Sequence, residues 1–388
     1  MKILMAHNFY QTGSPSGENS VYQSEVELLR KKGHIVITFE RHNDRLAGRT
    51  FLSLAWQNGP STVWSSQTYR ELRNLLKREK PEIAHFHNTF PQISPSAYYA
   101  CLDENVPVVQ TLHNFRLFCA NALLFRNGRI CEDCLKYGPI MGLVHGCYRN
   151  SRIYSLPVVA SEYIHSFLHT YQKAVSKFIA LTNFARDKFI AGGIKAGKIT
   201  VKSNFVDIPQ GQNQAGNYAI FIGRLDEMKG IEILVKAARF LPEVSWQVVG
   251  DGPLKQTMVK TATKNVSFHG LQPFSRTIDL LAHSRLLVMP SEWFETFGRT
   301  IVEAFACGKP VVASRLGAMA EIVEHGWTGL LFSPGDAEAL AAAVKQLMED
   351  KSQAEEMGQN ARKTYEKLYT PDKNYEQLME IYQQAITR

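Results

Sequence analysis

Residues 292–314 have the sequence EWFETFGRTIVEAFACGKPVVAS, which is typical of a helix followed by a buried strand. The helix is predicted to start near Phe297, with Glu295 before it and Glu303 two turns inside it. The unpaired N–H groups of Phe297 and Gly298 at the mouth of such a helix would form an anion site, stabilising each charge by roughly 0.3–2 kcal/mol. Spacing alone favours a simpler interpretation, a pair of solvated glutamates on a surface helix.

The same alternation of short apolar runs with helical patterns continues in both directions from this stretch. It predicts βαβ units and parallel sheets, and it restarts after a polar, Asn- and Gln-rich segment. A length of 388 residues at about 150 per domain also indicates two or three domains. We therefore predict an α/β protein with two Rossmann-like, doubly wound parallel-sheet domains that face a central cleft. The predicted parts are an N-terminal domain over 1–205, a linker over 206–217, a second domain over 218–371 and a final helix over 372–388.

Composition excludes several classes of protein. Hydrophobic residues make up 45% and charged residues 21% of the chain, which is typical of a globular protein rather than a disordered one. No apolar run approaches the ~18–20 residues of a membrane helix, and the first residues do not resemble a secretion signal. Six cysteines without an export signal indicate a reducing compartment, so we expect a cytoplasmic protein.

Positive charge is concentrated in the first half of the chain. Residues 1–205 carry 25 Lys and Arg against 14 Asp and Glu, whereas the remainder carries 19 against 22. A basic half favours peripheral contact with an anionic membrane or with a polyanionic substrate, and a solvated surface fits equally well. We expect no nucleic-acid partner.

A pair of cations follows one predicted strand of the second half. In GRLDEMKG (223–230), Arg224 and Lys229 come directly after the strand, where two cations suit a diphosphate. Basic residues after a strand are common, so the pair gains weight only from sharing a domain with Glu295 and Glu303. The glycine-rich turn VGDGPL (249–254) lacks the third glycine of G-x-G-x-x-G, and no P-loop string occurs, which weighs against hydride transfer and P-loop chemistry.

Histidines end two predicted strands of the first half. His85 and His87 lie in AHFHN, and His113 lies in TLHN. A histidine at a strand end is more often a hydrogen-bonded structural group than a catalyst, and His113 is the better candidate of the three. G-x-S-x-G, H-E-x-x-H and D-x-D strings are absent, which weighs against hydrolase, zincin and aspartate-held manganese chemistry.

Four of the six cysteines are spaced C-x11-C-x2-C-x12-C in a glycine-rich stretch predicted to be irregular. Four thiolates could hold a structural zinc ion, but a single C-x2-C pair fits buried free thiols equally well, and disulfides are a third choice. Cys101 and Cys307 fall in helical patterns and are expected to pack in the core. The four candidate zinc ligands are Cys119, Cys131, Cys134 and Cys147.

These motifs together resemble the signature of glycosyltransferase family 4. The resemblance rests on E-x7-E at an FG-containing helix start, on EAFACGKPVVAS (303–314), and on LGAMAEIVEHGWTGLLFSPGD (316–336). The GRLDEMKG, VGDGPL and TLHN segments extend it over almost the whole chain. The loop SPSGENS (14–20) departs from the family pattern, because Ser16-Gly17 stands where the family has two glycines.

The resemblance implies the GT-B fold and transfer of a sugar from a nucleotide-diphosphate donor, with a UDP or GDP base, to an acceptor hydroxyl. Retention at the anomeric carbon and independence from a catalytic metal are also implied, as is a glycan or lipid-linked acceptor. Two alternatives stay open, a GT-B sugar-nucleotide epimerase and a non-catalytic sugar-nucleotide-binding subunit. By position, the resemblance implies that Arg224 and Lys229 bind the donor diphosphate and that Glu303 binds the ribose. It implies that Glu295 orients the transferred sugar together with the backbone amides of Phe297 and Gly298. Gly17 would contact the donor phosphates, and His113 would contact the sugar near the reacting carbon.

Overall fold

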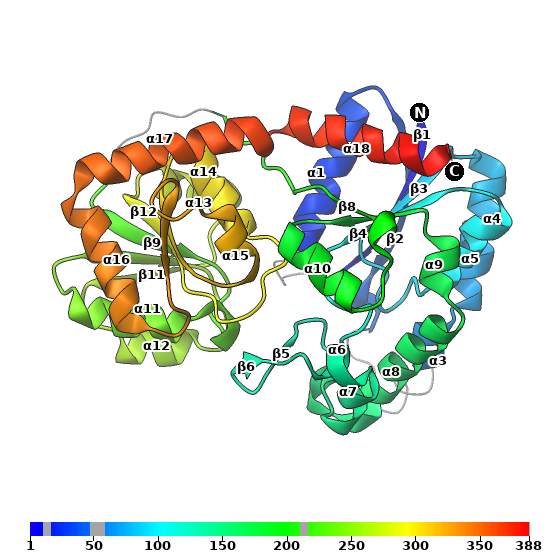
Figure 1. Cartoon of the computed structure of the whole chain (residues 1–388), viewed down its shortest axis with the longest axis horizontal. Helices are drawn as coiled ribbons and strands as arrows, with labels where there is room; N and C mark the ends of the chain where they lie inside the picture. The colour runs from blue at the N-terminus through cyan, green and yellow to red at the C-terminus, as the bar shows by residue number, and fades with distance from the viewer. Residues whose placement is uncertain (11–16, 47–58, 210–215, 388) are drawn as a thin grey trace. The chain divides into compact units, whose positions relative to one another are not determined.

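The computed structural model describes residues 1–10, 17–46, 59–209 and 216–387. They form two compact units, each with its own sheet (Figure 1). Half of the predicted linker over 206–217 (residues 210–215) and residues 14–16 of the SPSGENS loop lie outside the described residues. The first unit comprises Met1–Leu124, Cys131–Lys202 and Tyr375–Arg388, and the second comprises Phe125–Ile130 and Ser203–Asn374.

The sheet of the first unit is parallel, with the strand order β2-β1-β3-β4-β7-β8. Its central strands β3 and β4 are buried along their whole length, as expected for a sheet covered by helices on both faces. The strands are β1 (Lys2–Phe9), β2 (Ile35–His42), β3 (Ile83–Phe86), β4 (Val108–Leu112), β7 (Lys177–Ala180) and β8 (Ile199–Val201).

Helices connect these strands and cover the sheet. They are α1 (Gly17–Lys31), η1 (Asn43–Leu46), α3 (Gly59–Val63), α4 (Ser66–Glu79), α5 (Ser96–Asp103), α6 (Asp133–Tyr137), α7 (Ile140–Val144), η3 (Tyr148–Asn150), α8 (Arg152–Phe167), α9 (Thr170–Ala174), α10 (Asn183–Ala191) and η4 (Ala196–Lys198). A short antiparallel hairpin, β5 (Phe125–Arg126) with β6 (Arg129–Ile130), interrupts this unit in sequence and groups with the second one.

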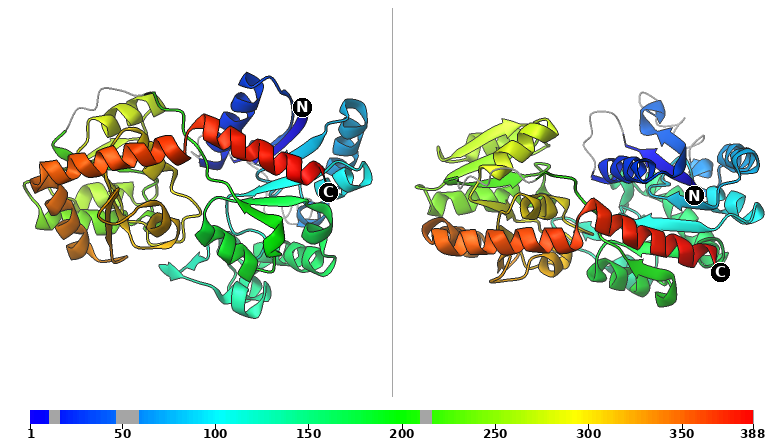
Figure 2. Two further views of the ribbon diagram at one scale, coloured as in Figure 1. Left: turned by 45° about the horizontal axis from the view of Figure 1, so that its top comes forward. Right: turned by 90° about the horizontal axis from the view of Figure 1, so that it is seen from above.

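The last helix of the chain, α18 (Pro371–Ile386), completes the core of the first unit. Leu378, Ile381 and Tyr382 are buried against Ile3 and Met5 of β1 and against the apolar face of α1. Figure 2 shows α18, drawn in red, running along the first unit beside these elements. The end of the sequence is therefore part of the hydrophobic core that its beginning forms.

The sheet of the second unit is also parallel, with the order β11-β10-β9-β12-β13-β14. The strands are β9 (Tyr218–Ile222), β10 (Ser245–Val249), β11 (Val266–Gly270), β12 (Leu286–Met289), β13 (Val311–Ser314) and β14 (Gly329–Phe332). The helices are η5 (Glu227–Lys229), α11 (Ile231–Phe240), α12 (Lys255–Thr261), α13 (Phe274–Ala282), α14 (Arg299–Ala306), α15 (Gly317–Ile322), α16 (Ala337–Glu349) and α17 (Lys351–Leu368).

Both strand orders reverse direction at one point. Strands β10 and β11 lie on one side of β9, and β12 to β14 lie on the other; in the first unit β1 and β3 meet at the corresponding point. In doubly wound sheets ligands bind beyond the carboxyl ends of the strands that flank this switch point. The segments that follow β9 and β12 are therefore the first place to look for a site in the second unit.

Several elements differ from the sequence-based prediction. The helix predicted near Phe297 begins at Arg299, because Gly298 has a φ of 128° and breaks the helical backbone before it. Helix α8 lies in a stretch predicted to be irregular, where Pro157 weakened the helical pattern. Among the described residues, none of the helices has the length and apolar character needed to cross a bilayer.

The packing of α18 makes a testable prediction about stability. Leu378 is fully buried in the first unit's core, so Leu378→Ala should lower the free energy of unfolding of that unit by about 2–5 kcal/mol. Gln377→Ala, at an exposed position of the same helix, is the control and should change it by less than about 0.5 kcal/mol. The free energies of unfolding of both variants are measured by urea denaturation monitored by circular dichroism. Equal losses of stability in the two variants would contradict the packing of α18 into this core.

Candidate functional site

The turn after β9 carries both predicted cations and is held in shape by its own residues. The carboxylate of Asp226 accepts a hydrogen bond from the backbone N–H of Lys229 at 3.1 Å, which closes η5. Gly230 follows with a φ of 67°, and a Cβ there would lie 1.9 Å from the carbonyl oxygen of Pro290. Only glycine lets this turn approach the segment after β12 so closely.

A second glycine brings another turn against the same place. Gly250, at the end of β10, has a φ of 140°, and a Cβ on it would lie 1.9 Å from the carbonyl oxygen of Gly223. The turns after β9, β10 and β12 therefore pack together at the carboxyl edge of the sheet. The VGDGPL segment supports the cation turn by this packing.

Lys229 and Glu295, which are 66 residues apart in sequence, form an ion pair across the switch point. The Nζ atom of Lys229 lies 2.6 Å from Oε1 of Glu295, and the ammonium lies over the ring of Trp293. The hydroxyl of Ser291 and the indole N–H of Trp293 also donate to Oε1, at 3.1 and 3.0 Å. Glu295 is only 7% exposed, so these contacts fix the position of both charges.

Arg224 lies at the same turn but is exposed. Its Nε is 3.2 Å from Oδ2 of Asp226, and 64% of its side chain is accessible to solvent. Burial raises the pKa of Asp226, and the nearby Lys229 and Arg224 oppose that rise. Asp226 thus binds one nitrogen of the Arg224 guanidinium, and the exposed remainder of that group can bind an anion through two N–H donors.

Glu303 lies on α14 and has a different partner. Its Oε1 is 3.0 Å from Nε of Arg299, one helical turn earlier. Burial raises the pKa of Glu303, and the charge of Arg299 opposes this. The contacts of the described residues do not join Glu303 to the Lys229–Glu295 pair. Phe297, whose ring packs at an edge against Tyr369, and Gly298 precede the helix instead of starting it.

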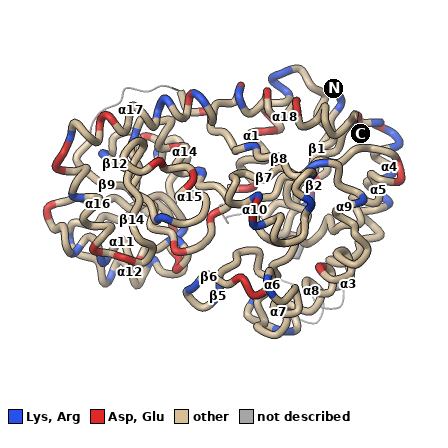
Figure 3. Tube along the Cα trace, in the orientation of Figure 1, with Lys and Arg blue, Asp and Glu red and all other residues tan. Residues whose placement is uncertain are grey.

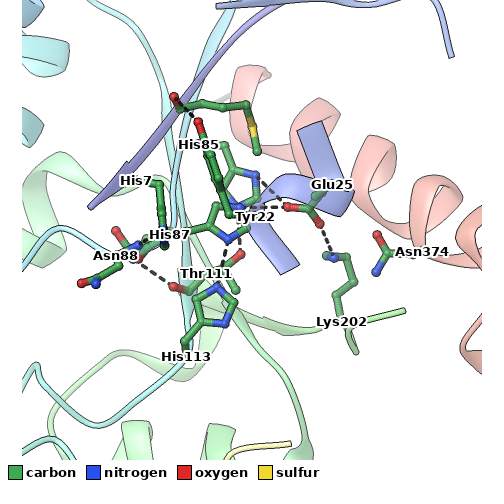
Figure 4. Close-up of polar contacts among 12 residues, drawn as sticks. His7, Tyr22, Glu25, His85, His87, Asn88, Thr111, His113, Lys202 and Asn374 are labelled. Carbon is green, nitrogen blue, oxygen red and sulfur yellow. Dashed lines mark hydrogen bonds and ion pairs between the residues drawn. The ribbon is translucent and has the colours of Figure 1, made fainter. Parts of the chain in front are cut away.

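In the first unit, the predicted histidine lies in a buried polar cluster. His113 follows β4, and its Nε2 is 2.9 Å from Nδ1 of His87, which follows β3; the two rings are stacked (Figure 4). Burial lowers the pKa of His113 well below its ordinary value, and that of His7 on β1 to about 3, so both rings are neutral. His85 is bonded to Tyr382 and Thr111, at 2.7 and 2.8 Å.

Glu25 and Lys202 complete this cluster, and the sequence analysis did not identify either of them. The Nζ of Lys202 is 2.8 Å from Oε1 of Glu25, and both side chains are buried. A signal for Glu25 is present in the sequence, because it falls between Val21 and Leu29 at helical spacing on the buried face of α1. No comparable pattern marks Lys202, which becomes buried only when β8 joins the sheet.

A cavity of about 70 Å³ opens beside the histidines, in the first unit alone. Glu162 of α8 lines it, and burial raises the pKa of Glu162 well above its ordinary value. Gln110, which donates to the carbonyl of His87 at 2.6 Å, forms another part of the wall. The lining also includes Asn88, Tyr98, Thr111, His113 and Arg116.

Gly17 is the first residue of α1 and is exposed. A Cβ built on it would meet no atom within 4 Å, so packing does not require glycine there. Its backbone is open at the amino end of a 15-residue helix, where a negative group is favoured. Ser16 lies outside the described residues.

The four clustered cysteines do not fit a zinc site. A tetrahedral zinc with bonds of about 2.3 Å needs its sulfur atoms close to one another. Among the described residues, only Glu25, His85 and His87 bring three potential ligand atoms within 4.8 Å of one another. None of the six cysteines, all of which lie in described parts of the chain, is in a disulfide, and a hydrogen bond from Cys134 lowers the pKa of Cys119 to about 6. The loop holds its thiols by ordinary packing and hydrogen bonds.

Comparison with known proteins places the chain in a family. Residues 16–210 match the model of Glycosyltransferase Family 4, and residues 205–364 match that of Glycosyl transferases group 1. N-acetyl-alpha-D-glucosaminyl L-malate synthase of Bacillus anthracis is 31% identical over 322 residues, covering 80% of this chain and 77% of that protein. Sulfoquinovosyl transferase SQD2 of Arabidopsis thaliana is 36% identical over 152 residues, 38% of this chain and 30% of that longer protein.

Solved structures agree on the fold. HepE of Anabaena, crystallised in complex with UDP, superposes with a TM-score of 0.70 at 22% identity, covering 98% of this chain and 99% of that one. Sucrose-phosphate synthase of Thermosynechococcus elongatus gives the same TM-score at 18% identity. Two parallel-sheet units with these matches establish that the chain belongs to glycosyltransferase family 4 and has the GT-B fold.

Proposed function

We propose that this glycosyltransferase moves a sugar, with retention at the anomeric carbon, from a UDP-sugar to an acceptor hydroxyl, without a catalytic metal. The observation that supports this most directly is the Lys229–Glu295 pair at the switch point of the second sheet. A half-buried ammonium held by this ion pair could supply the counter-charge that a departing diphosphate needs. UDP is proposed over GDP because HepE, a protein of the same fold, was solved with UDP and with UDP-glucose.

The proposed mechanism is stabilisation of the leaving group by charge. As the bond between the sugar and the diphosphate breaks, negative charge grows on the diphosphate, and Arg224 and Lys229 neutralise it. Glu303 would accept hydrogen bonds from the ribose hydroxyls. Glu295 would hold Lys229 in place and orient the transferred sugar together with the amides before α14. The leaving phosphate would take the proton of the acceptor hydroxyl, so no protein nucleophile is needed.

The resemblance also supports roles toward the donor for Gly17 and His113. The open backbone of Gly17 at the start of α1 would meet the donor phosphates. His113, neutral and beside the polar cavity, would contact the transferred sugar. A transferase needs a second, hydroxyl-bearing substrate, and the cavity beside His113 would bind part of a glycan or lipid-linked acceptor.

A thermal-shift screen tests the donor. At equal concentrations, UDP and UDP-glucose should raise the melting temperature of the protein, because a ligand at 100 times its Kd stabilises the folded state by about 2.7 kcal/mol. GDP and GDP-mannose should have little effect. Stabilisation by the guanosine nucleotides alone would overturn the choice of base and leave the transferase proposal standing.

Removal of the Lys229 ammonium tests the mechanism. Lys229→Ala should lower kcat by about 10- to 150-fold, the equivalent of one charge-assisted hydrogen bond in the transition state, and should change the KM for acceptor little. Lys260→Ala, at an exposed position of α12, is the matched control and should leave kcat unchanged. An unaltered kcat in Lys229→Ala would exclude Lys229 from the mechanism.

Two other functions fit the same donor site. A sugar-nucleotide epimerase would convert the free sugar nucleotide without an acceptor, and a non-catalytic subunit would bind the donor without converting it. The proposed set Arg224, Lys229, Glu295 and Glu303 is complete in this chain, which favours an active enzyme. Incubation with a radiolabelled UDP-sugar, with and without acceptor, separates the three functions.

We further propose that α8 and the segment before it bind an anionic membrane. Ile153, Leu156, Ile164 and Phe167 follow one face of α8 and are exposed, Phe167 by 83%. Exposed cations precede them in sequence, namely Lys136, Arg149 and Arg152. We call these seven residues the α8 patch. Basic residues otherwise occur along many elements of the first unit (Figure 3). Apolar side chains combined with cations are typical of proteins that bind peripherally to anionic lipid, which would bring the enzyme to a lipid-linked acceptor.

Flotation with liposomes tests the α8 patch. The protein should float with vesicles that contain phosphatidylglycerol at low salt and dissociate at high salt, because salt screens the cations. The double variant Phe167→Ser with Ile164→Ser should weaken binding to the vesicles about tenfold or more, because it removes two apolar side chains that would become buried in the lipid. Phe240→Ser, at an exposed apolar position of α11, is the control. Absence of binding at low salt would overturn the membrane proposal.

A further inference from the structure

The buried cluster around His87 joins a carboxylate to His113 through one histidine (Figure 4). Glu25 Oε2 lies 3.0 Å from Nε2 of His87, off the ideal N–H direction, and His87 Nδ1 lies 2.9 Å from Nε2 of His113. All three side chains are buried. Glu25 of α1 thus contacts His87, which follows β3, and His87 contacts His113, which follows β4. We call these three residues the Glu25 relay.

The charge of Glu25 is well determined by its surroundings. Burial alone would raise the pKa of Glu25, but the ammonium of Lys202 and the two nearby histidines outweigh burial and hold that pKa well below its ordinary value. Lys202 binds the other oxygen, Oε1, at 2.8 Å. Glu25 is therefore an ionised carboxylate, and such a group can only accept hydrogen bonds.

The polarity of the relay follows from this. The Nε2 of His87 faces an acceptor. A His87 ring with a single proton therefore carries it on Nε2, which leaves Nδ1 of His87 as an acceptor. The ring nitrogen of His113 that faces it, Nε2, must then be the donor. His113 is neutral, so its remaining nitrogen, Nδ1, has no proton and accepts hydrogen bonds.

We propose that Glu25 and His87 are positioning residues that fix the proton of His113 on Nε2, so that Nδ1 of His113 can accept a hydrogen bond from a substrate hydroxyl. The tautomer follows from the contacts of the relay and the charge of Glu25, whereas its role toward a sugar hydroxyl rests on the proposed function. Neither Glu25 nor His87 is assigned a contact with the sugar.

A second group of three side chains, which shares Glu25 and His87 with the relay, does not favour a metal ion. Glu25, His85 and His87 have ligand atoms within 4.8 Å of one another. The ammonium of Lys202 already supplies one positive charge 2.8 Å from the carboxylate, and it would repel a cation bound there. The hydroxyls of Tyr382 and Thr111 occupy both nitrogens of His85. The cluster is balanced in charge and largely satisfied in hydrogen bonds without a metal.

Replacement of Glu25 by its amide should reverse the relay. Lys202 can only donate, so the carbonyl oxygen of Glu25→Gln should turn to Lys202 and present its NH2 group to Nε2 of His87. His87 must then accept at Nε2 and carry its proton on Nδ1, which donates to His113. His113 must then accept at Nε2 and carry its own proton on Nδ1. The substitution changes only Glu25, which contacts His113 solely through His87.

Nitrogen-15 NMR of histidine-labelled protein tests this without any substrate. Multiple-bond correlation spectra at pH 8 distinguish protonated from unprotonated ring nitrogens, and loss of signals in His113→Gln assigns them. In the unaltered protein His113 should be the Nε2–H tautomer; the Nδ1–H tautomer would overturn the proposal, whether or not any variant folds. The two nitrogen shifts of His113 should exchange in Glu25→Gln and stay unchanged in the control Glu40→Gln, whose parent carboxylate accepts the hydroxyl of Tyr22 outside the relay.

Kinetics and metal binding complete the test. Glu25→Gln should lower kcat with a UDP-sugar by up to about tenfold, the equivalent of one hydrogen bond. The Kd for UDP should stay unchanged, because no residue of the relay is proposed to contact UDP. A reversed tautomer with an unchanged kcat would overturn the role toward the sugar and leave the transferase proposal intact. Stoichiometric Zn²⁺ binding that is lost in Glu25→Gln would overturn the relay, since a bound metal requires His87 without a proton on the ligating nitrogen.

Discussion

Parallel pairing of the strands is the constraint on which both sites depend. In a parallel sheet all carboxyl ends lie at one edge, so residues that follow different strands meet there although they are far apart in sequence. Lys229 follows β9 and Glu295 follows β12, and the reversal of strand order between these neighbours brings them into contact. His87 and His113 meet in the same way after β3 and β4. The chemistry of this protein is thus located by sheet topology.

The two units stabilise their buried carboxylates in different ways. In the second unit, one oxygen of Glu295 accepts from an ammonium, a hydroxyl and an indole, so the carboxylate is held at the edge of the sheet where a ligand can reach it. In the first unit, Glu25 and Lys202 are wholly buried, where loss of either partner would leave an unpaired charge. A pair of the first kind suits contact with a substrate, and one of the second kind suits the orientation of neighbours.

The comparisons and the geometry support each other at different levels. The family models establish the fold and the class of reaction, whereas the individual contacts carry the proposals about donor, mechanism and acceptor. The four cysteines show why contacts are needed. Their spacing is compatible with zinc, but spacing along a loop does not show whether the sulfur atoms meet. Cys119 and Cys134 are in contact, yet no three of the four sulfur atoms lie within 4.8 Å of one another.

The sequence by itself determined the α/β class, the restart of the pattern after the polar segment and the position of Arg224 and Lys229 directly after a strand, because these depend on local periodicity and on which residues follow each strand. It did not reveal α8, whose pattern is weakened by Pro157, or the partners Arg299, Asp226 and Tyr382. Only the tertiary structure placed Glu25 beside Lys202, 177 residues away, and joined that pair to His113 through His87. The physical reason is that a buried charge is tolerated only beside its partner, and the partner's position is set by the register and order of strands rather than by the neighbouring sequence.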